Sequence, residues 1–272
     1  MNKTKIEWTD YTWNPVTGCW GPGGSAGEPQ RCFYCYAQRM AHRLPPSWVP
    51  KPFRMGVDPF QPTFYPDRLS QPAKVKKPSK FFTCSMGDLC GDWVPTDCIA
   101  AILESGPYKC PQHTFQFLTK NPKRYQEFNP WLSNCWLLTT ITNQQDADER
   151  IPELLKAEAP VLGVSVEPML GAIDFGMIPC RHESHYADGC INALTGEWWP
   201  ALGSISQEYQ ERIQGECLNW LILGALTGPG SKQHQTKPEW VQSLIDQARA
   251  AGVPVFLKSN LNWPEKIQEW PE

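Results

Sequence analysis

The sequence has no long apolar run. No stretch approaches the ~20 residues that a membrane-spanning helix needs, and the Met1–Lys5 start lacks the apolar core of a signal peptide. We therefore expect a cytoplasmic protein that makes no membrane contact. An internal repeat and a low-complexity tract are also missing, which argues against repeat architectures and disordered linkers.

An excess of one charge is also missing. The 272 residues carry 25 basic and 28 acidic side chains, for a formal net charge of −3. This balance implies neither a general polyanion-binding surface nor an acidic tail.

Eleven cysteines are many for such a chain. Their odd number, without a secretory leader, argues against a disulfide framework and for a reducing compartment. The cysteines are then metal ligands or small buried apolar residues. The second interpretation is favoured for five that lie in or beside predicted elements: Cys84, Cys90, Cys98, Cys110 and Cys135.

Short apolar runs alternate with helical patterns along the chain. The predicted strands are Thr12–Val16, Lys80–Ser85, Thr114–Thr119, Trp136–Ile141, Val161–Val166, Asn219–Gly224 and Pro254–Lys258. The predicted helices are Tyr34–Arg43, Thr96–Glu104, Pro122–Phe128, Asp146–Ala157 and Glu239–Ala251. This alternation favours parallel strands joined by right-handed crossovers. It predicts an α/β fold, a full or partial parallel barrel, as a single domain over residues 1–272.

Two segments interrupt the alternation. Residues 44–78 are rich in proline and basic residues, and they predict a loop over one end of the barrel. Residues 176–217 predict a loop-rich insertion between two strands.

Polar residues recur where the predicted strands end, and in parallel barrels the reactive groups gather at those ends. Ser85 and Asp88 follow the second strand, Lys120 follows the third, and Glu167 follows the fifth. Each has an ordinary alternative, such as a turn cap or a solvated loop residue. Their recurrence favours one shared site.

Cys19, Cys32 and Cys35 form a group near the start of the chain. A C-x2-C pair alone fits zinc, a redox dithiol or an iron–sulfur cluster. Zinc would need a fourth ligand nearby, and the dithiol leaves Cys19 unexplained. An iron–sulfur cluster on three cysteines uses all of them and leaves one iron open, which favours a catalyst.

Motifs along nearly the whole chain carry a resemblance to a known family. They are Ile6–Asp10, Trp13–Cys19, Cys32–Ala37, Ser85–Leu89, Pro111–Phe115 with Leu118–Lys120, Ala147–Pro152, Ser165–Pro168 and Gly224–Gly230. On these motifs the sequence resembles a phage and prophage family of unknown function. That family is similar to radical S-adenosylmethionine (SAM) enzymes and distantly to spore photoproduct lyase.

The resemblance implies a TIM-like barrel of the radical SAM type. It implies a 4Fe-4S cluster on the three cysteines, with SAM on the free iron and a 5′-deoxyadenosyl radical as the reactive product. An external electron donor, such as flavodoxin or ferredoxin, is implied as a partner.

The resemblance also suggests positions around SAM. Ser85 and Asp88 would face the methionine amino group, and Lys120 or Arg150 would pair with its carboxylate. The remaining positions are Ser165 and Glu167 near ribose or substrate, and the backbone at Gly224 near adenine.

The chain departs from its relatives at two places. Twelve residues separate Cys19 from Cys32, a longer gap than in relatives, and the extra Gly21–Gly27 stretch predicts a flexible bulge. Gly87 and Ala225-Leu226-Thr227 stand where relatives more often have Ser and Gly-Glu-Ser.

A second metal site is suggested inside the insertion. Cys180, His182, His185 and Cys190 have zinc-type chemistry, with Cys217 as a substitute ligand. A polar loop with a chance cysteine pair is the alternative.

The substrate is open, with nucleic acid or a nucleotide suggested by the resemblance. The basic and aromatic segment Trp48–Lys77 would follow a phosphate backbone and stack bases, or only cover the barrel mouth. Two other functions remain: a non-catalytic zinc or iron–sulfur interaction module, and a cluster-free hydrolase using Glu167 and Asp88.

Overall fold

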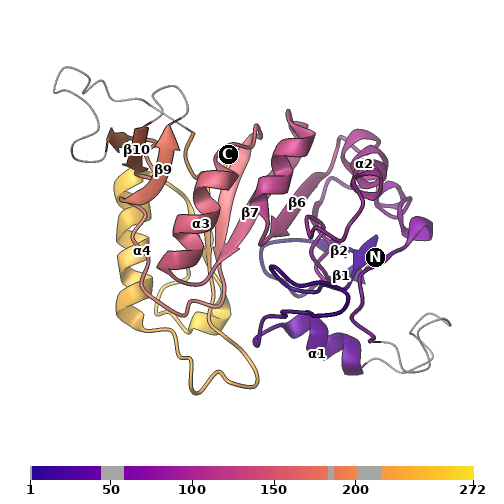
Figure 1. The fold of residues 1–272 in the computed structure, drawn as a ribbon, viewed down its shortest axis with the longest axis horizontal. Coiled ribbons are helices and arrows are strands. Elements are labelled where there is room, and N and C mark those ends of the chain that lie inside the picture. The colour runs from indigo at the N-terminus through magenta and orange to yellow at the C-terminus, as the bar shows by residue number, and fades with distance from the viewer. Residues whose placement is uncertain (1, 44–57, 183–186, 201–215) are drawn as a thin grey trace. The chain divides into compact units, whose positions relative to one another are not determined.

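The computed structural model describes residues 2–43, 58–182, 187–200 and 216–272. The chain divides into two compact units (Figure 1). Unit 1 comprises Met1–Asn121 and Leu132–Trp136, and unit 2 comprises Pro122–Trp131 and Leu137–Glu272.

Unit 1 is built on three parallel strands. β2 (Tyr11–Trp13) pairs with β5 (Lys80–Thr83), β5 pairs with β6 (Thr114–Thr119), and the short β1 (Asn2–Lys3) runs antiparallel to β2. A separate pair joins β3 (Val16–Thr17) to β4 (Thr63–Phe64). The helical elements are α1 (Tyr36–Arg43), η3 (Pro66–Arg68), η4 (Pro72–Lys74), α2 (Thr96–Leu103) and a π-helical continuation, η5 (Glu104–Tyr108).

The predicted strand Thr12–Val16 is split in two in the structure. β2 ends at Trp13, and β3 begins at Val16 in another sheet. Pro15 lies at the break, and proline has no N–H to donate to a strand ladder. The split turns the chain toward the loop that carries Cys19.

The core of unit 1 is aromatic. Trp13, Phe81 and Phe115 have no more than trace exposure, and the Phe81 and Phe115 rings stack at 5.5 Å. The Trp13 indole donates to the carbonyl of Arg68 at 2.8 Å. This packing fixes β2 and β5, whose carboxyl ends carry the candidate site.

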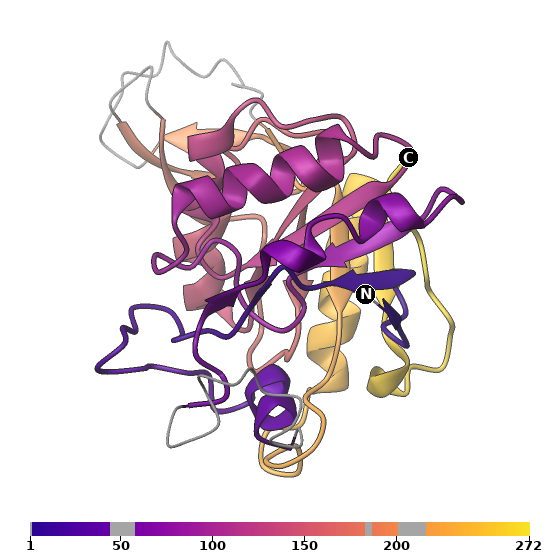
Figure 2. The same ribbon diagram turned by 90° about the vertical axis from the view of Figure 1, so that its right-hand side faces the viewer.

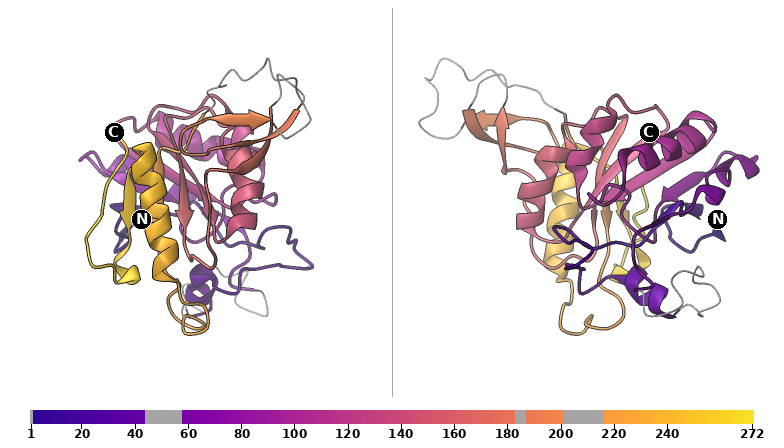
Figure 3. Two further views of the ribbon diagram at one scale, coloured as in Figure 1. Left: turned by 90° about the vertical axis from the view of Figure 1, so that its left-hand side faces the viewer. Right: turned by 45° about the vertical axis from the view of Figure 1, so that its right-hand side comes forward.

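Unit 2 contains further parallel strands. They are β7 (Cys135–Ile141, which begins at the unit boundary), β8 (Val161–Val166), β12 (Trp220–Leu223) and β13 (Val255–Leu257). β12 lies between β8 and β13 and is parallel to both. The helical elements are η6 (Pro122–Phe128), α3 (Gln144–Leu154), α4 (Pro238–Ala251) and η8 (Ser259–Leu261). Figure 3 shows α4, in gold, beside the strands of this unit.

α4 forms as its sequence predicts. Pro238 occupies the first turn, and Gly252 ends the helix with φ +72°. The Pro122–Phe128 segment, expected as an α-helix, is instead a 3₁₀ helix.

The predicted insertion contains strands. β9 (Ile178–His182), β10 (Ala187–Ile191) and β11 (Trp198–Pro200) form an antiparallel sheet in the order β11-β10-β9. β9 lies against α3 (Figure 1). The expectation of mainly irregular loop therefore does not hold for the described residues 178–182 and 187–200.

All seven predicted parallel strands are present, with helices in the connections between them. The α/β class with parallel strands is therefore confirmed. Among the helices that the structure describes, none has the length and apolar character needed to cross a membrane.

Candidate metal and cofactor site

The three cysteines lie on one loop of unit 1. The loop leaves β3, passes Cys19, makes a long excursion and returns through Cys32 and Cys35 to α1. Figure 2 shows this indigo segment as an extended loop that ends at α1. None of the three cysteines is in a disulfide.

The twelve-residue gap between Cys19 and Cys32 closes on itself. The N–H of Gln30 donates to the carbonyl of Trp20 at 2.7 Å, and Arg31 Nε donates to the carbonyl of Cys19 at 2.8 Å. Gly21 has φ +84°, and a Cβ there would lie 1.9 Å from the Gln30 carbonyl oxygen. The two ends of the excursion are therefore joined, so the segments that carry Cys19 and Cys32 stay together despite the long gap.

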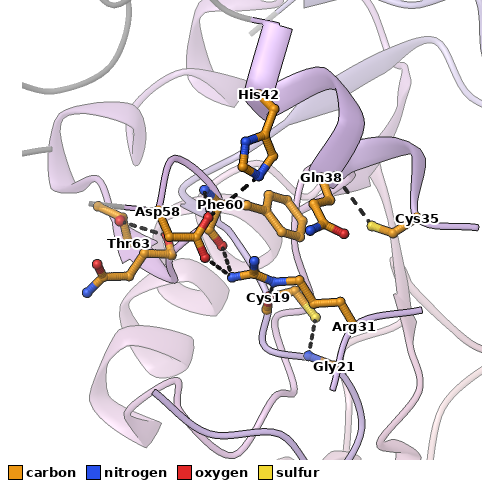
Figure 4. A network of polar contacts seen from close by, with 10 residues as sticks. Cys19, Gly21, Arg31, Cys35, Gln38, His42, Asp58, Phe60 and Thr63 are labelled. Atoms are coloured by element: carbon orange, nitrogen blue, oxygen red, sulfur yellow. Dashed lines mark hydrogen bonds and ion pairs between the residues drawn. The ribbon is translucent and has the colours of Figure 1, made fainter. Parts of the chain in front are cut away.

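Two of the cysteine sulfurs accept backbone hydrogen bonds (Figure 4). The N–H of Gly21 donates to Cys19 Sγ at 3.1 Å, and the N–H of Gln38 donates to Cys35 Sγ at 3.3 Å. Both cysteines also pack against the small apolar cluster of Ala37, Ala41 and Phe60. Donors aimed at sulfur stabilise negative charge on a thiolate or a cluster ligand.

The pKa of the Cys19 thiol is raised from 9.0 to about 12. Burial is the main cause and the Asp88 carboxylate adds to it, while the Gly21 N–H and Lys120 oppose the shift and Cys32 raises it slightly. The thiol of the metal-free protein is therefore protonated at neutral pH. A cationic metal centre reverses this balance, because it deprotonates a thiol that binds it.

Arg31 is a site residue that sequence reasoning missed. Besides the Cys19 carbonyl, its guanidinium forms an ion pair with Asp58, lies 3.4 Å from the carbonyl oxygen of Phe60 and stands 5.4 Å from the Phe60 ring centre. Burial raises the pKa of Asp58, but the hydrogen bonds from Arg31 and from the Phe60 N–H, together with the Arg31 charge, leave it below 3.8. His42 Nε2 approaches Asp58 at 3.8 Å (Figure 4).

The turn after β5 lies against the cysteine loop. The N–H of Gly18 donates to the carbonyl of Met86 at 2.8 Å, and the Tyr36 hydroxyl donates to the carbonyl of Ser85. Cys84 begins the turn with φ +62°, a conformation that non-glycine residues rarely adopt.

Asn14 organises the same turn from β2. Its Oδ1 accepts from the Ser85 hydroxyl at 3.2 Å and from the Met86 N–H at 2.9 Å. Sequence reasoning did not single out Asn14, because its partners are 71 and 72 residues away.

The close approach of the Gly18 backbone accounts for glycine at position 87. Gly18 and Gly87 form an isolated parallel bridge, and a Cβ on Gly87 would lie 2.8 Å from the Gly18 carbonyl oxygen. A side chain at this position would collide with the backbone of the cysteine loop, so the close approach requires glycine.

Asp88 and Lys120 connect the β5 turn to the end of β6. Asp88 accepts from the Thr119 hydroxyl at 2.6 Å, the Cys90 N–H at 3.1 Å and the Lys120 N–H at 3.0 Å. The Lys120 ammonium lies 5.7 Å from the Tyr34 ring centre. Unit 1 thus brings Ser85, Asp88 and Lys120 together with the cysteines.

Unit 2 holds the other predicted site residues. Ser165 is buried in β8. Glu167 forms an ion pair with Lys258 and lies 3.4 Å from Asn260 Nδ2. A Cβ on Gly224 would lie 2.9 Å from the Glu167 carboxyl carbon, so Gly224 leaves room for that side chain.

Arg150 is held within unit 2. It donates to the Thr140 carbonyl at 2.7 Å and pairs with Asp146 at 2.6 Å. Asp146 in turn accepts from the Thr142 N–H and hydroxyl. These bonds brace the end of β7 against α3.

The predicted second metal site falls partly outside the described residues. His185 is among those not described, and Cys190 pairs in register with Pro179. In the part of the chain that the structure describes, no three His, Cys, Asp or Glu side chains are arranged to hold a single metal ion. Zinc at this place stays a prediction.

The donor set of the cysteine loop fits an iron–sulfur cluster. It offers three free thiols, two of them with N–H donors at sulfur, beside a small apolar cluster. Tetrahedral zinc needs four close ligands, whereas a cluster is larger and accepts three thiolates with one iron left over.

Comparisons with known proteins identify structures with a similar fold and the family to which the chain belongs. No curated protein matches the chain. A mutant of spore photoproduct lyase matches with a TM-score of 0.52 and 14% identity, covering 94% of this chain and 79% of that one. A second mutant, "with bound AdoMet and dinucleoside spore photoproduct", matches with a TM-score of 0.50 and 14% identity, covering 93% and 78%.

At this identity the similarity shows the fold, and it agrees with the predicted partial parallel barrel. A family model covers almost all of the sequence, from residue 3 to residue 269. The chain therefore belongs to the family described as "Protein of unknown function (DUF5131)".

Proposed function

We propose that this protein is a radical SAM enzyme that holds a 4Fe-4S cluster on Cys19, Cys32 and Cys35. The observation that carries the proposal is the three-cysteine loop, closed by its own hydrogen bonds and seated on the β5 turn. The fold similarity to spore photoproduct lyase, including a structure with bound AdoMet, supports it.

A bound cluster would supply the electron for reductive cleavage of SAM to a 5′-deoxyadenosyl radical, which would abstract hydrogen from the substrate. That electron would come from an external donor such as flavodoxin or ferredoxin. The side chains of this protein contribute binding and positioning.

The protein would hold the methionine part of SAM in unit 1. The Asp88 carboxylate and the backbone at Ser85 accept hydrogen bonds from the amino group. Lys120 would neutralise the carboxylate, since its ammonium lies near the Tyr34 ring and close enough to Cys19 to affect the pKa of that thiol. Arg150 is less suited, because Thr140 and Asp146 already occupy its guanidinium.

The remaining residues that the sequence suggests for SAM or the substrate lie in unit 2. Ser165 and Glu167 are proposed for the ribose or substrate, and the Gly224 backbone for adenine. Lys258 joins this set, because its ion pair holds the Glu167 carboxylate in place. The substrate is proposed to be a nucleic acid or a nucleotide.

Anaerobic reconstitution tests the proposal. We expect a brown protein with about four irons per chain, which forms 5′-deoxyadenosine from SAM when reduced. Cys32→Ala should lose both the iron and the product. Cys98→Ala is the matched control, because Cys98 lies on α2, away from the loop, and should retain both.

Three outcomes would contradict the proposal. A colourless protein with one zinc and no iron would indicate an interaction module. A hydrolytic activity in air that survives Cys32→Ala would indicate a cluster-free barrel enzyme. A fully loaded protein that never cleaves SAM would reject the radical mechanism.

A further inference from the structure

A cavity of about 600 Å³ lies in unit 2 beyond the carboxyl ends of β12 and β13. Its walls come from the residues after β12, the first turn of α4 and the segment Asn260–Pro264 after β13. This volume lies in the range of small-molecule sites. None of the three cysteines lines it.

Three lining side chains make no ring contact, ion pair or hydrogen bond with the described residues. The half-buried indole of Trp263 makes no ring contact or hydrogen bond with any described residue. The Lys232 ammonium forms no ion pair, and the Gln235 amide forms no hydrogen bond, within the same part of the chain. An aromatic face, a cation and an amide are therefore all available at one cavity.

Asn262 ends η8 in the left-handed backbone conformation. It has φ +50°, and its N–H donates to the Ser259 carbonyl at 3.1 Å as η8 ends. The turn carries Asn262 and Trp263 to the cavity wall together.

One wall is shared with the Glu167 network. Asn260 lines the cavity and exchanges two hydrogen bonds with the Ala225 backbone, at 3.1 and 2.9 Å. The same amide lies 3.4 Å from Glu167, which pairs with Lys258. The cavity therefore adjoins residues that the proposed function places near the substrate.

We propose that this cavity binds the substrate as a nucleotide, with the planar base on the Trp263 ring and the phosphate at Lys232. Aromatic rings stack any base, and the Gln235 and Asn262 amides offer donors and acceptors to its edge. A lysine supplies the charge that a phosphate needs. Naming the ligand as substrate rests on the proposed function, but the binding itself does not.

Calorimetric titration of the cluster-free protein tests the cavity. The probes are AMP, CMP, GMP and dTMP, with adenosine, ribose 5-phosphate and S-adenosylhomocysteine as comparison ligands. We expect saturable submillimolar binding of at least one nucleotide. Trp263→Leu should weaken it about tenfold or more, whereas Trp263→Phe should restore most of the affinity, because it keeps an aromatic face.

The charge is tested separately. Lys232→Gln should weaken nucleotide binding and leave adenosine binding unchanged, because adenosine has no phosphate. Lys266→Gln is the matched control, since Lys266 is exposed and does not line the cavity.

The proposal is wrong if no nucleotide binds to the folded protein, or if Trp263→Leu leaves the affinity unchanged. It is also wrong if S-adenosylhomocysteine binds through Trp263 while the nucleotides do not, since the cavity then belongs to the cofactor. A protein that binds a nucleotide here but takes up no iron would reject the cluster and leave the cavity assignment intact. The two failures are therefore distinguishable.

Discussion

At the scale of single residues, Arg31 joins segments that are far apart in the chain. It bonds to the Cys19 carbonyl on one side and to Asp58 and Phe60 on the other. Only 12% of its side chain is exposed, so water replaces these bonds poorly when they are lost. Arg31 therefore acts on the cysteines through the loop backbone, as a positioning residue.

We expect Arg31→Gln to lower stability by about 1–2 kcal/mol and to reduce the iron bound per chain. Arg31→Lys should recover part of the stability through Asp58 but less of the iron, because one ammonium cannot also reach the Cys19 carbonyl in the same geometry. Urea unfolding and iron analysis measure the two effects. Arg43→Gln, at the exposed end of α1, is the control; equal losses in it and in Arg31→Gln would refute the role.

The raised pKa of Cys19 gives a second prediction. In the metal-free protein at pH 8, Cys19 should react with iodoacetamide far more slowly when folded than when unfolded in urea, because only the thiolate reacts. Raising the pH toward 12 should narrow the difference. Peptide mass spectrometry follows the label, and rapid labelling of folded Cys19 at pH 8 would contradict the burial that raises its pKa.

At the scale of elements, the excursion between Cys19 and Cys32 is largely self-contained. Ser25 and Glu28 exchange backbone hydrogen bonds, and residues 25–29 are exposed. The bonds that hold the cysteines together lie at its two ends, at Trp20–Gln30 and Cys19–Arg31. The exposed tip, residues 25–29, therefore contributes nothing to the bonds that hold the two ends of the excursion together.

Replacing Ser25–Pro29 by one glycine should leave the iron content unchanged and shift stability by only about 0.5 kcal/mol, as for other exposed changes. Gly21→Ala is the contrasting variant. It should lose iron and stability, because the Gly21 backbone is left-handed and touches Gln30. Thermal unfolding and iron analysis distinguish them, and a shortened loop without iron would show that the tip is required.

The sequence pattern predicts the main elements well, because buried strands and amphipathic helices leave a periodic signal. The spacing of Cys19, Cys32 and Cys35 suggests three metal ligands, and their ligation stays a prediction. The sequence pattern misses the break at Pro15 and the strands β9–β11, where short segments and polar residues hide the period. It also misses Asn14 and Arg31, because their partners are backbone groups or residues far away in sequence, and no local spacing encodes such contacts.

At the scale of the whole molecule, the comparisons confirm a family of unknown function and the parallel α/β fold. The phage origin, the cytoplasmic location and the electron donor stay predictions. Part of the Trp48–Lys77 segment proposed for nucleic acid, including Phe53 and Arg54, lies outside the described residues. Phe60 is in the core and is not available for stacking on a base.

Cofactor binding should stabilise the molecule through linkage, since a ligand that binds only the folded state raises its unfolding free energy. We expect SAM to raise the unfolding temperature of the reconstituted protein and to leave the metal-free protein nearly unchanged. Lys120→Ala should need about tenfold more SAM for the same shift. Lys76→Ala, an exposed lysine of the same unit, is the control, and an equal response in both variants would exclude Lys120 from the carboxylate site.

The bridge between Gly18 and Gly87 has a consequence for how the family can diverge. Neither position has room for a side chain. A Cβ at Gly18 would collide with the Gln61 carbonyl oxygen, and a Cβ at Gly87 would collide with the Gly18 carbonyl oxygen. A homologue with serine at one of these positions must therefore place the cysteine loop differently. Among homologues, the length of that loop and the identity of residue 87 should therefore covary, as paired changes inherited together.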